Sequence, residues 1–341
     1  MFLKELSLQN FRNHRELSLD LHELMYISGN NGVGKSSIVE AIHLLLTLKT
    51  FRHQSLSEVR TFAEPYVRIS AHFEGGNYDD LVFFYQDKRI LKAGGQEIVS
   101  LSDYTNALPV ICYSPGFDTI LSKDHSERRN FLDRMVFYTN HSHLNLVKSY
   151  NALLLRKRAE LDKDNPDSEL LNILNTQMAP ISKEISQNRN ILVHEINNSL
   201  LSTEELTTLF MPDMRLSLSI NDIDCDDVAT EIEKKRPTMG CHKDLLYIRQ
   251  NGRVLEKFQS FGQRKSALLF LLYHLAKRVE EIRKCDIMLL LDDFEAGLDG
   301  ERCSALSELF LMHPKGEFKR QIILTGVTNQ YINGANEIKL I

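Results

Sequence analysis

The sequence predicts an α/β fold with a mixed sheet as its core and a short helical subdomain inserted into it. Short apolar runs, typical of buried strands, occur at "LMYIS" (24–28), "IMLLL" (287–291) and "RQIILTG" (320–326). Strongly apolar helical patterns follow the first run and precede the second. The middle of the chain, from about 118 to 209, has no glycine and repeats the apolar spacing of helices. An insertion between two halves of one α/β domain accounts for this order.

The N-terminal part alternates between strands and one buried helix. Residues 2–8 and 17–27 have the apolar pattern of strands. The stretch "SSIVEAIHLLLTL" (36–48) predicts a helix that is apolar on most sides and therefore buried. Residues 66–99 predict a meander of strands, with glycine pairs marking its turns.

The middle of the chain predicts two helices that form a short arm. At 1.5 Å per residue, a helix over residues 143–163 spans only about 30 Å. The second helical stretch, 168–201, contains Pro180, which we expect to kink or break it. Residues 118–209 are therefore predicted to be the inserted arm, and residues 1–117 and 210–341 the two parts of the enclosing domain. Strands return from about Met214, and helices are expected at 265–283 and 300–312.

Composition limits the compartment and the class of partner. Five scattered cysteines without a CxxC pair favour a reducing compartment and argue against disulfides or structural zinc. The chain has no apolar run of membrane-spanning length and no signal-peptide pattern, so we expect a cytoplasmic protein without membrane contact. The formal net charge is −5, so any binding of nucleic acid has to use a local basic patch.

The stretch "SGNNGVGKSS" (28–37) fits the phosphate-binding pattern G-x-x-x-x-G-K-[ST]. Backbone N–H groups of such a loop surround phosphate oxygens, and the next helix points its N-terminus at them. Lysine supplies a positive charge and serine a ligand for Mg²⁺. The alternative, a coincidental turn, is disfavoured because a buried strand leads in and a buried helix leads out. The predicted nucleotide-binding residues are Gly29, Asn30, Asn31, Gly32, Gly34, Lys35, Ser36 and Ser37.

A second half of the site is predicted at "IMLLLDD" (287–293). A buried strand that ends in two carboxylates places them at the edge of the sheet where α/β proteins bind ligands. Asp292 is expected to hold Mg²⁺ together with Ser36, and Asp293 to orient or deprotonate the attacking water. With Lys35 they form the predicted catalytic set. The alternative is a solvated strand end.

The order of these motifs resembles the heads of ABC-type ATPases. "SFGQ" (260–263) precedes the acidic strand by some thirty residues and looks like the signature of that superfamily, and "GLD" (297–299) looks like its D-loop. The resemblance implies that Ser260, Gly262 and Gln263 contact the γ-phosphate held by a second subunit, with Asp299 nearby. By themselves, the same residues could be a helix N-cap.

Further motifs resemble the RecF family of bacterial recombination and gap-repair ATPases. They are "LQNFRN" (8–13), "SERRNFLD" (126–133), "GCHKDL" (240–245) and "LLLDDFEAGLD" (289–299), so the resemblance extends over almost the whole chain. It implies that Arg12 and Asn13 touch the nucleotide, although an ordinary exposed turn is the alternative. It also implies ATP and Mg²⁺ as cofactors, double-stranded DNA, RecR- and RecO-type mediators as partners, and an ATP-dependent homodimer.

Several charged residues keep two interpretations. Arg128 and Arg129 either contact DNA or stabilise the fold through Asp133. The run Arg156, Lys157 and Arg158, with Lys148, either meets phosphates or forms a solvated face. The residues His242, Lys243 and Asp244 either act at the nucleotide-binding site or have no role in it. Thr325 lies where ABC-type heads often place a histidine, and its hydroxyl can sense phosphate.

The functional hypothesis is ATP-gated dimerisation on double-stranded DNA or on single-strand/double-strand junctions, with slow hydrolysis and help in loading the recombinase. We expect slow hydrolysis because Asp293 is one methylene shorter than the usual glutamate. One alternative is a nucleotide-gated protein-interaction ATPase in which DNA binding is secondary. A divergent RecF paralogue and an SMC-like or defence ATPase are further versions of it. A transporter ATPase is disfavoured because "SERRNFLD" has no reason to occur there.

Overall fold

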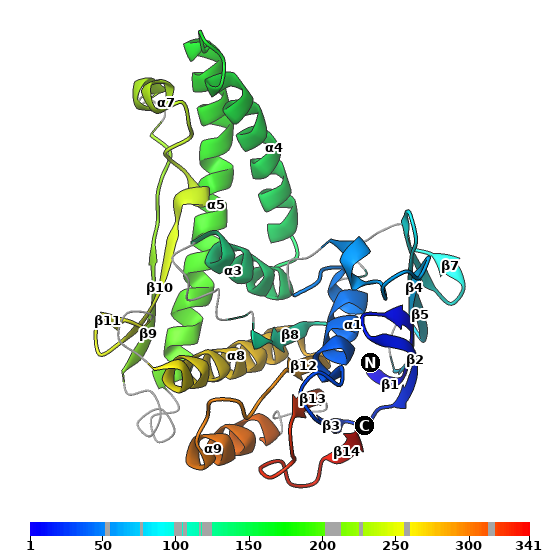
Figure 1. Cartoon of the computed structure of the whole chain (residues 1–341). Coiled ribbons are helices and arrows are strands. Elements are labelled where there is room, and N and C mark those ends of the chain that lie inside the picture. The colour runs from blue at the N-terminus through cyan, green and yellow to red at the C-terminus, as the bar shows by residue number, and fades with distance from the viewer. Residues whose placement is uncertain are drawn as a thin grey trace. The chain divides into compact units, whose positions relative to one another are not determined.

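The computed structural model of the chain describes every residue except 52–54, 76–77, 99–103, 105–107, 116, 118–124, 202–212, 225–227, 256–259 and 313–317. The predicted domain boundaries near 118 and 209 and the first residue of "QSFGQRKS" lie outside the described residues. The chain divides into two compact units (Figure 1). The head unit comprises Met1–Asp118 and Ser260–Ile341, and the insertion unit comprises Thr119–Gln259.

The head unit contains an antiparallel sheet with the strand order β2-β1-β4-β5-β6-β7. Residues along β4 alternate between the buried face and the more exposed face, as the period of two in a strand requires. The sheet confirms the predicted meander. Its strands are β1 (Phe2–Phe11), β2 (His14–Asp20), β4 (Val67–Glu74), β5 (Asp80–Tyr85), β6 (Arg89–Ala93) and β7 (Gln96–Glu97).

The second sheet of the head unit is parallel throughout, with the order β14-β3-β13-β12-β8. All five residues of β12 are buried, which is the pattern of a strand covered on both faces. Because the strands are parallel, the residues that follow them meet at one edge. The strands are β3 (Leu24–Ser28), β8 (Val110–Tyr113), β12 (Ile287–Leu291), β13 (Arg320–Gly326) and β14 (Asn336–Lys339).

One hydrophobic core joins the two sheets of the head unit. Helix α1 (Lys35–Thr47) contacts strands of both sheets and is buried along most of its length. Helix α8 (Phe261–Arg283) packs against β8, β12 and α9 (Gly300–Leu311), and a short 3-10 turn, η1 (Leu56–Val59), lies close to β1. These elements confirm the predicted α/β class, with its strands divided between two sheets.

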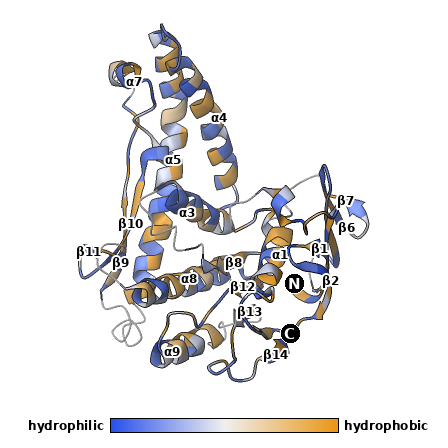
Figure 2. Cartoon of the chain, in the orientation of Figure 1, coloured by the Kyte–Doolittle hydropathy of each residue, from blue (hydrophilic) through white to orange (hydrophobic). Residues whose placement is uncertain are grey.

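Among its described residues, the insertion unit combines four helices with a small sheet. Helices α4 (His143–Leu161) and α5 (Ser168–Leu201) pack together, and both carry hydrophobic and hydrophilic residues along their length (Figure 2). Asp167 caps α5, since its Oδ1 accepts from the backbone N–H of Glu169 at 2.9 Å. The other elements are α3 (His125–Thr139), α7 (Val228–Lys234), η3 (Cys241–Lys243), β9 (Met214–Ser219), β10 (Leu245–Gln250) and β11 (Arg253–Val254).

The structure differs from the prediction at two places in this unit. Helix α5 continues through Pro180, so the break considered there is wrong, while a kink at Pro180 stays a prediction. The unit also extends to Gln259, whereas the predicted arm ended at residue 209. The reason is that β9 packs on α5, where the amide of Asn197 exchanges two hydrogen bonds with the backbone of Leu216, at 2.8 and 2.9 Å. Within the part of the chain that the structure describes, no helix is both long and apolar enough to cross a membrane.

Candidate nucleotide-binding site

The phosphate loop joins β3 to α1 in the head unit. Strand β3 ends at Ser28 and α1 begins at Lys35. Gly34, just before the helix, has a φ of 109°, a region that favours glycine. A Cβ at Gly34 would lie 2.3 Å from Nε2 of His14 and 2.6 Å from Nδ2 of Asn13. Both the backbone conformation and the close approach therefore require glycine here.

The side chain of Lys35 binds the loop that precedes it. Its Nζ donates to the carbonyl oxygens of Gly29 at 2.6 Å and Asn30 at 2.9 Å, and the residue is buried. From the other side, Nδ2 of Asn13 donates to the carbonyl oxygen of Val33 at 3.1 Å. These contacts engage carbonyl groups of the loop, whereas phosphate binding uses backbone N–H groups.

The two aspartates that follow β12 are both held by one hydroxyl group. Oγ1 of Thr325, on the neighbouring strand β13, donates to Oδ1 of Asp292 at 2.7 Å. The same oxygen accepts from the backbone N–H of Asp293 at 2.8 Å. Thr325 and Asp292 are almost completely buried. Thr325 therefore fixes the carboxylate of the first aspartate and the backbone of the second.

The segment after β12 is also anchored to α8. Asp293 has a φ of 55°, and the chain turns sharply there. The buried Nζ of Lys265 donates to the carbonyl oxygens of Asp293 at 2.5 Å and Ala296 at 2.8 Å. The sequence prediction gave no role to Lys265. A lysine at the start of the apolar run "KSALLFLLYHLA" was the available signal, because a buried amine needs acceptors.

A cavity of about 320 Å³ lies between the phosphate loop and the acidic segment, within the size range of small-molecule sites. Its lining includes most of the predicted nucleotide-binding residues and one predicted catalytic aspartate. Asp292 adjoins it through Thr325, and Gly29 and Asn30 through Lys35. The lining residues are Asn13, Asn31, Gly32, Gly34, Lys35, Ser36, Ser37, Pro115, Asp293 and Thr325.

Arg12 does not line this cavity; it ties β1 to α1 and η1. Its Nε and Nη2 donate to the two carboxylate oxygens of Glu40 at 2.9 and 2.7 Å, and Glu40 is fully buried. Its Nη1 donates to the carbonyl oxygen of Glu58 at 2.8 Å. Arg12 thus lies in the turn after β1, as the alternative has it, but its side chain is bound and not simply exposed. Asn13, next in the chain, remains a candidate ligand of the nucleotide.

The signature residues begin α8. Ser260 is its N-cap: Oγ accepts from the N–H of Gln263 at 3.4 Å, and Oε1 of Gln263 accepts from the N–H of Ser260 at 2.9 Å. This reciprocal arrangement is a capping box. Ser260 is exposed. A Cβ at Gly262 would lie 2.4 Å from the carbonyl oxygen of Gly297, so the signature and the D-loop approach each other closely.

Asp299 of the D-loop caps α9. Its Oδ1 accepts from the N–H of Arg302 at 2.9 Å, and its Oδ2 from Nη1 of the same residue at 2.9 Å. The N-cap alternative for Ser260 is thus present in the structure, and Asp299 has a capping role of its own. Their contact with a nucleotide held by a second subunit stays a prediction.

A further carboxyl group near the acidic segment was missed. Glu295 accepts from the hydroxyl of Tyr26 at 2.5 Å. Burial raises the pKa of Glu295, and the hydrogen bond from Tyr26 offsets only part of this rise. The tyrosine lies within the apolar run of β3, where its hydroxyl needs a buried partner. This pair links β3 to the segment after β12.

Replacing Thr325 by valine should slow ATP hydrolysis by about 10- to 100-fold and leave ATP affinity nearly unchanged, because the two hydrogen bonds lost orient the aspartates and each is worth about 0.5–3 kcal/mol. Thr325→Ser keeps the hydroxyl and should keep most of the rate. Phosphate release measures kcat, and calorimetric titration with a non-hydrolysable analogue measures affinity. A Thr325→Val protein that loses affinity and keeps kcat would contradict this role.

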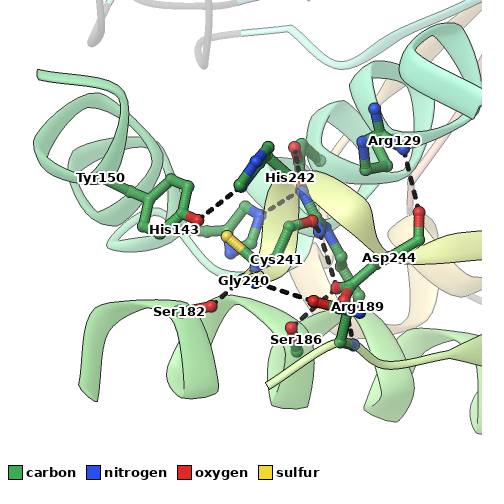
Figure 3. Close-up of polar contacts among 12 residues, drawn as sticks. Arg129, His143, Tyr150, Ser182, Ser186, Arg189, Gly240, Cys241, His242 and Asp244 are labelled. Atoms are coloured by element: carbon green, nitrogen blue, oxygen red, sulfur yellow. Dashed lines mark hydrogen bonds and ion pairs between the residues drawn. The ribbon is translucent and has the colours of Figure 1, made fainter. Parts of the chain in front are cut away.

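The motif "GCHKD" lies in the insertion unit, where it contacts α5 and α4 (Figure 3). Arg189 of α5 is the centre of this cluster. Its Nε and Nη2 donate to the two carboxylate oxygens of Asp133, both at 2.8 Å. Its Nη1 donates to Oδ2 of Asp244 at 2.8 Å and to the carbonyl oxygen of Cys241 at 2.6 Å. Arg189 therefore connects α3, α5 and the motif.

Asp244 is completely buried, and both its carboxylate oxygens and its carbonyl oxygen accept hydrogen bonds. Its Oδ2 accepts from the hydroxyl of Ser186 at 2.7 Å, and its Oδ1 from the N–H of Asn221 at 3.0 Å. Its carbonyl oxygen accepts from Nη1 of Arg129 at 3.0 Å (Figure 3). Asp244 is thus a structural anion of the insertion unit.

His242 is held by the hydroxyl of Tyr150 on α4, 2.7 Å from its Nδ1. Burial, followed by the charge of Lys243, lowers the pKa of His242 to about 3, so the ring is neutral at pH 7. The preceding Gly240 has a φ of 111°, and a Cβ there would lie 2.2 Å from the oxygen of Tyr150. The motif therefore packs tightly on α4.

For some of the basic residues that had two interpretations, the structure favours one of them. Nη1 of Arg128, which is buried, donates to the carbonyl oxygen of Leu246 at 2.8 Å. Asp133, the expected partner of Arg128 and Arg129, instead forms the ion pair with Arg189. The structural interpretation is therefore supported for Arg128, through a partner that the sequence did not indicate, while both interpretations stay open for Arg129.

Lys157 is neither solvated nor available to phosphate. Its Nζ lies 2.5 Å from Oε2 of Glu231 on α7 and 2.5 Å from Oδ1 of Asn175 on α5. All three residues are fully buried. The run 156–158 is consequently not one continuous basic surface.

Residues 1–108 match a family described as the AAA ATPase domain. Over 89% of this chain and 86% of the relative, 28% of residues are identical to the DNA replication and repair protein RecF of Leptospira biflexa. The RecF protein of Rickettsia typhi is 27% identical, with 100% of this chain and 99% of the relative covered. The chain is a relative of the RecF proteins. The resemblance predicted from the motifs and the predicted ATPase class are both confirmed.

Solved structures support the fold. The recombination mediator protein RecF with ATP, described as part of the RecFOR pathway, superimposes with a TM-score of 0.83 at 22% identity, covering 99% of this chain and 95% of that one. An Smc head bound to the C-terminal winged-helix domain of ScpA gives a TM-score of 0.57 at 14% identity, covering 99% and 94%. The ABC-type head predicted from the order of the motifs is therefore confirmed as the fold.

Proposed function

We propose that the chain is an ATP-dependent DNA-binding repair protein that dimerises on DNA when it binds ATP. The observation that carries this proposal is the cavity at the edge of the parallel sheet, which Lys35, Ser36 and Asp293 line together. It lies in a chain whose relatives are named DNA replication and repair protein RecF. A cationic loop facing a carboxylate suits binding and hydrolysis of a triphosphate.

The donors at this cavity also fit Mg²⁺, which prefers oxygen ligands and keeps several waters. The hydroxyl of Ser36 would be one ligand, and Asp292 would act through water. The metal would neutralise charge on the phosphates. Asp293 would orient the attacking water, and Lys35 would leave its carbonyl partners for phosphate oxygens. We expect slow hydrolysis because the side chain of an aspartate reaches less far than that of a glutamate. We also expect DNA to stimulate the hydrolysis.

In the proposed dimer each ATP is shared between two subunits. Ser260, Gly262 and Gln263 of one subunit would meet the γ-phosphate held by Lys35 of the other, with Asp299 close by. The exposed N-terminus of α8 supports this, since the first turn of a helix presents N–H groups and a positive dipole to anions. Loss of the γ-phosphate would then open the dimer.

The proposed ligand is double-stranded DNA or a single-strand/double-strand junction, held by its phosphates without sequence readout. The proposed partners are RecR- and RecO-type mediators, by analogy with the RecF structures described in the RecFOR pathway. The proposed outcome is recombinase loading during gap repair. The proposed location of the protein is the cytoplasm.

Complementation between two inactive variants tests the shared site. Lys35→Met and Ser260→Arg should each lose nearly all DNA-stimulated ATPase activity, because neither variant alone can form a site with both halves intact. Mixing the two should restore part of the activity, since the heterodimer contains one site with both halves intact. Activity is read by phosphate release. A mixture as inactive as its components, with dimers present by light scattering, counts against sharing.

The alternative is a nucleotide-gated protein-interaction ATPase in which DNA is secondary. The formal net charge of −5 favours it, because the surface as a whole repels DNA. Fluorescence anisotropy with a labelled duplex, with and without ATP, separates the two. Partner binding with no duplex binding in either nucleotide state would support the alternative.

A further inference from the structure

The insertion unit carries cations from several elements around Lys243 of η3. Arg129 of α3 reaches the peptide carbonyl next to it, at Asp244. Arg236 follows α7, and its backbone N–H binds the carbonyl oxygen of Glu231 at 3.2 Å. The carboxylate of Glu231 in turn binds Lys157, the residue before Arg158 on α4. These contacts join α3 to the end of η3 and α4 to α7, and the hydrogen bond between Tyr150 and His242 joins α4 to η3.

The electrostatics agree with this placement. Burial, followed by the charges of Arg236, Arg129 and Arg158, lowers the pKa of Lys243. The same Arg158 and Lys243 also lower the pKa of His242. These cations therefore lie close enough to Lys243 and His242 to act on them electrostatically.

Two buried anions near these cations, Glu231 and Asp244, are already engaged. Oε2 of Glu231 binds Lys157, and its Oε1 accepts from the N–H of Thr238 at 2.8 Å. Asp244 is occupied by Arg189, Ser186 and Asn221, as described above. Among the described residues, none of the three cations Arg158, Arg236 and Lys243 forms an ion pair. Arg158 and Arg236 are exposed, and Lys243 is half-buried.

We propose that Arg158, Arg236 and Lys243, with Arg129 behind them, form a binding site for the phosphate backbone of duplex DNA on the insertion unit. The proposal rests on the proposed function and assigns residues to its DNA contact. A rigid base supports the site, because the buried cluster around Arg189 and Asp244 fixes η3 on α5 (Figure 3). The planar forks of the arginines suit phosphate oxygens, and Lys243 adds a point charge. A backbone contact of this kind is independent of sequence.

The chain offers a matched control two residues away. Arg156 is an exposed arginine on the same helix, but it lies about 200° around the helix from Arg158. It lines a separate groove together with Leu170, Ile173 and Lys163. Arg156→Gln therefore removes the same charge from the same element without touching the proposed site.

The test compares wild-type, Arg156→Gln and the triple variant Arg158→Gln/Arg236→Gln/Lys243→Gln as full chains. Anisotropy of a fluorescent duplex of arbitrary sequence is measured with Mg-ATP over a range of NaCl concentrations. The triple variant should bind at least about tenfold more weakly, and its slope of log affinity against log salt should fall by about 2–3, since each phosphate contact contributes about 0.9. Arg156→Gln should match wild-type, and all three should bind ATP alike.

The outcomes are separable. A triple variant with wild-type affinity and slope overturns the site. So does a triple variant that keeps duplex binding but loses binding to an acidic partner protein, since the patch would then be a protein-binding surface. If the wild-type chain binds no duplex with or without ATP, the proposed function itself is wrong. Circular dichroism of the triple variant confirms folding, and the single variant Arg158→Gln, with a slope change of about 1, is a milder second measurement.

Discussion

Replacing Lys35 by methionine should weaken ATP binding by at least about tenfold and slow hydrolysis by about 100- to 1,000-fold. Charge-assisted hydrogen bonds are worth about 1.5–3 kcal/mol each, which corresponds to at least about tenfold in affinity. Loss of one donor to charge that develops in the transition state costs about 100- to 1,000-fold in rate. Lys35 is the only lysine among the residues described as lining the cavity, so no neighbour there supplies the same charge. Calorimetric titration with an ATP analogue and phosphate release measure the two effects.

The same variant tests nucleotide gating. Light scattering with Mg-ATP and duplex DNA should show dimers of the wild-type chain and monomers of Lys35→Met. Lys92→Met, at an exposed position on β6, is the control for a lysine-to-methionine change and should dimerise normally. If Lys35→Met formed ATP-dependent dimers as readily as wild-type, the gating hypothesis would be wrong.

The elements of the head unit were predictable because their signals are local. Helix α1 begins at the lysine of the phosphate pattern, and β12 covers the apolar run ending before Asp292. The meeting of the two motifs was also predictable. Parallel strands bring the residues after them to one edge, and Leu291 and Leu324 are paired in register. The prediction therefore needed only the strand ends and their direction.

The other features depend on contacts between distant residues. The sequence gives no local signal that Asp244 belongs with Arg189, 55 positions earlier, so the strands after residue 214 were assigned to the wrong unit. Likewise, the run 156–158 looks uniformly basic, yet its middle residue is buried against Glu231 on another helix. Thr325 was recognised as a hydroxyl near phosphate, but its hold on both aspartates follows from strand register alone.

Replacing Asp244 by alanine should destabilise the insertion unit by about 3–5 kcal/mol, the usual cost of removing one partner of a buried ion pair. Arg189 would keep Asp133 but lose one acceptor, and the hydroxyl of Ser186 and the N–H of Asn221 would lose theirs. The melting transition of this unit should fall by roughly 10 °C, at about 2–4 °C per kcal/mol for a unit of this size. Differential scanning calorimetry can resolve it, because two units need not unfold together.

The controls separate a structural role from a catalytic one. Asp222→Ala, an exposed aspartate of the same unit, should change the transition little. Asp244→Asn keeps acceptor capacity and loses the charge, so its effect should lie between the two. At a temperature well below the transition, Asp244→Ala should still bind ATP with wild-type affinity, because its carboxylate contacts α5 and a backbone N–H within the insertion unit. A fully stable Asp244→Ala protein with lost ATPase activity would instead place "GCHKD" at the reaction, which is the interpretation that the buried contacts of Asp244 argue against.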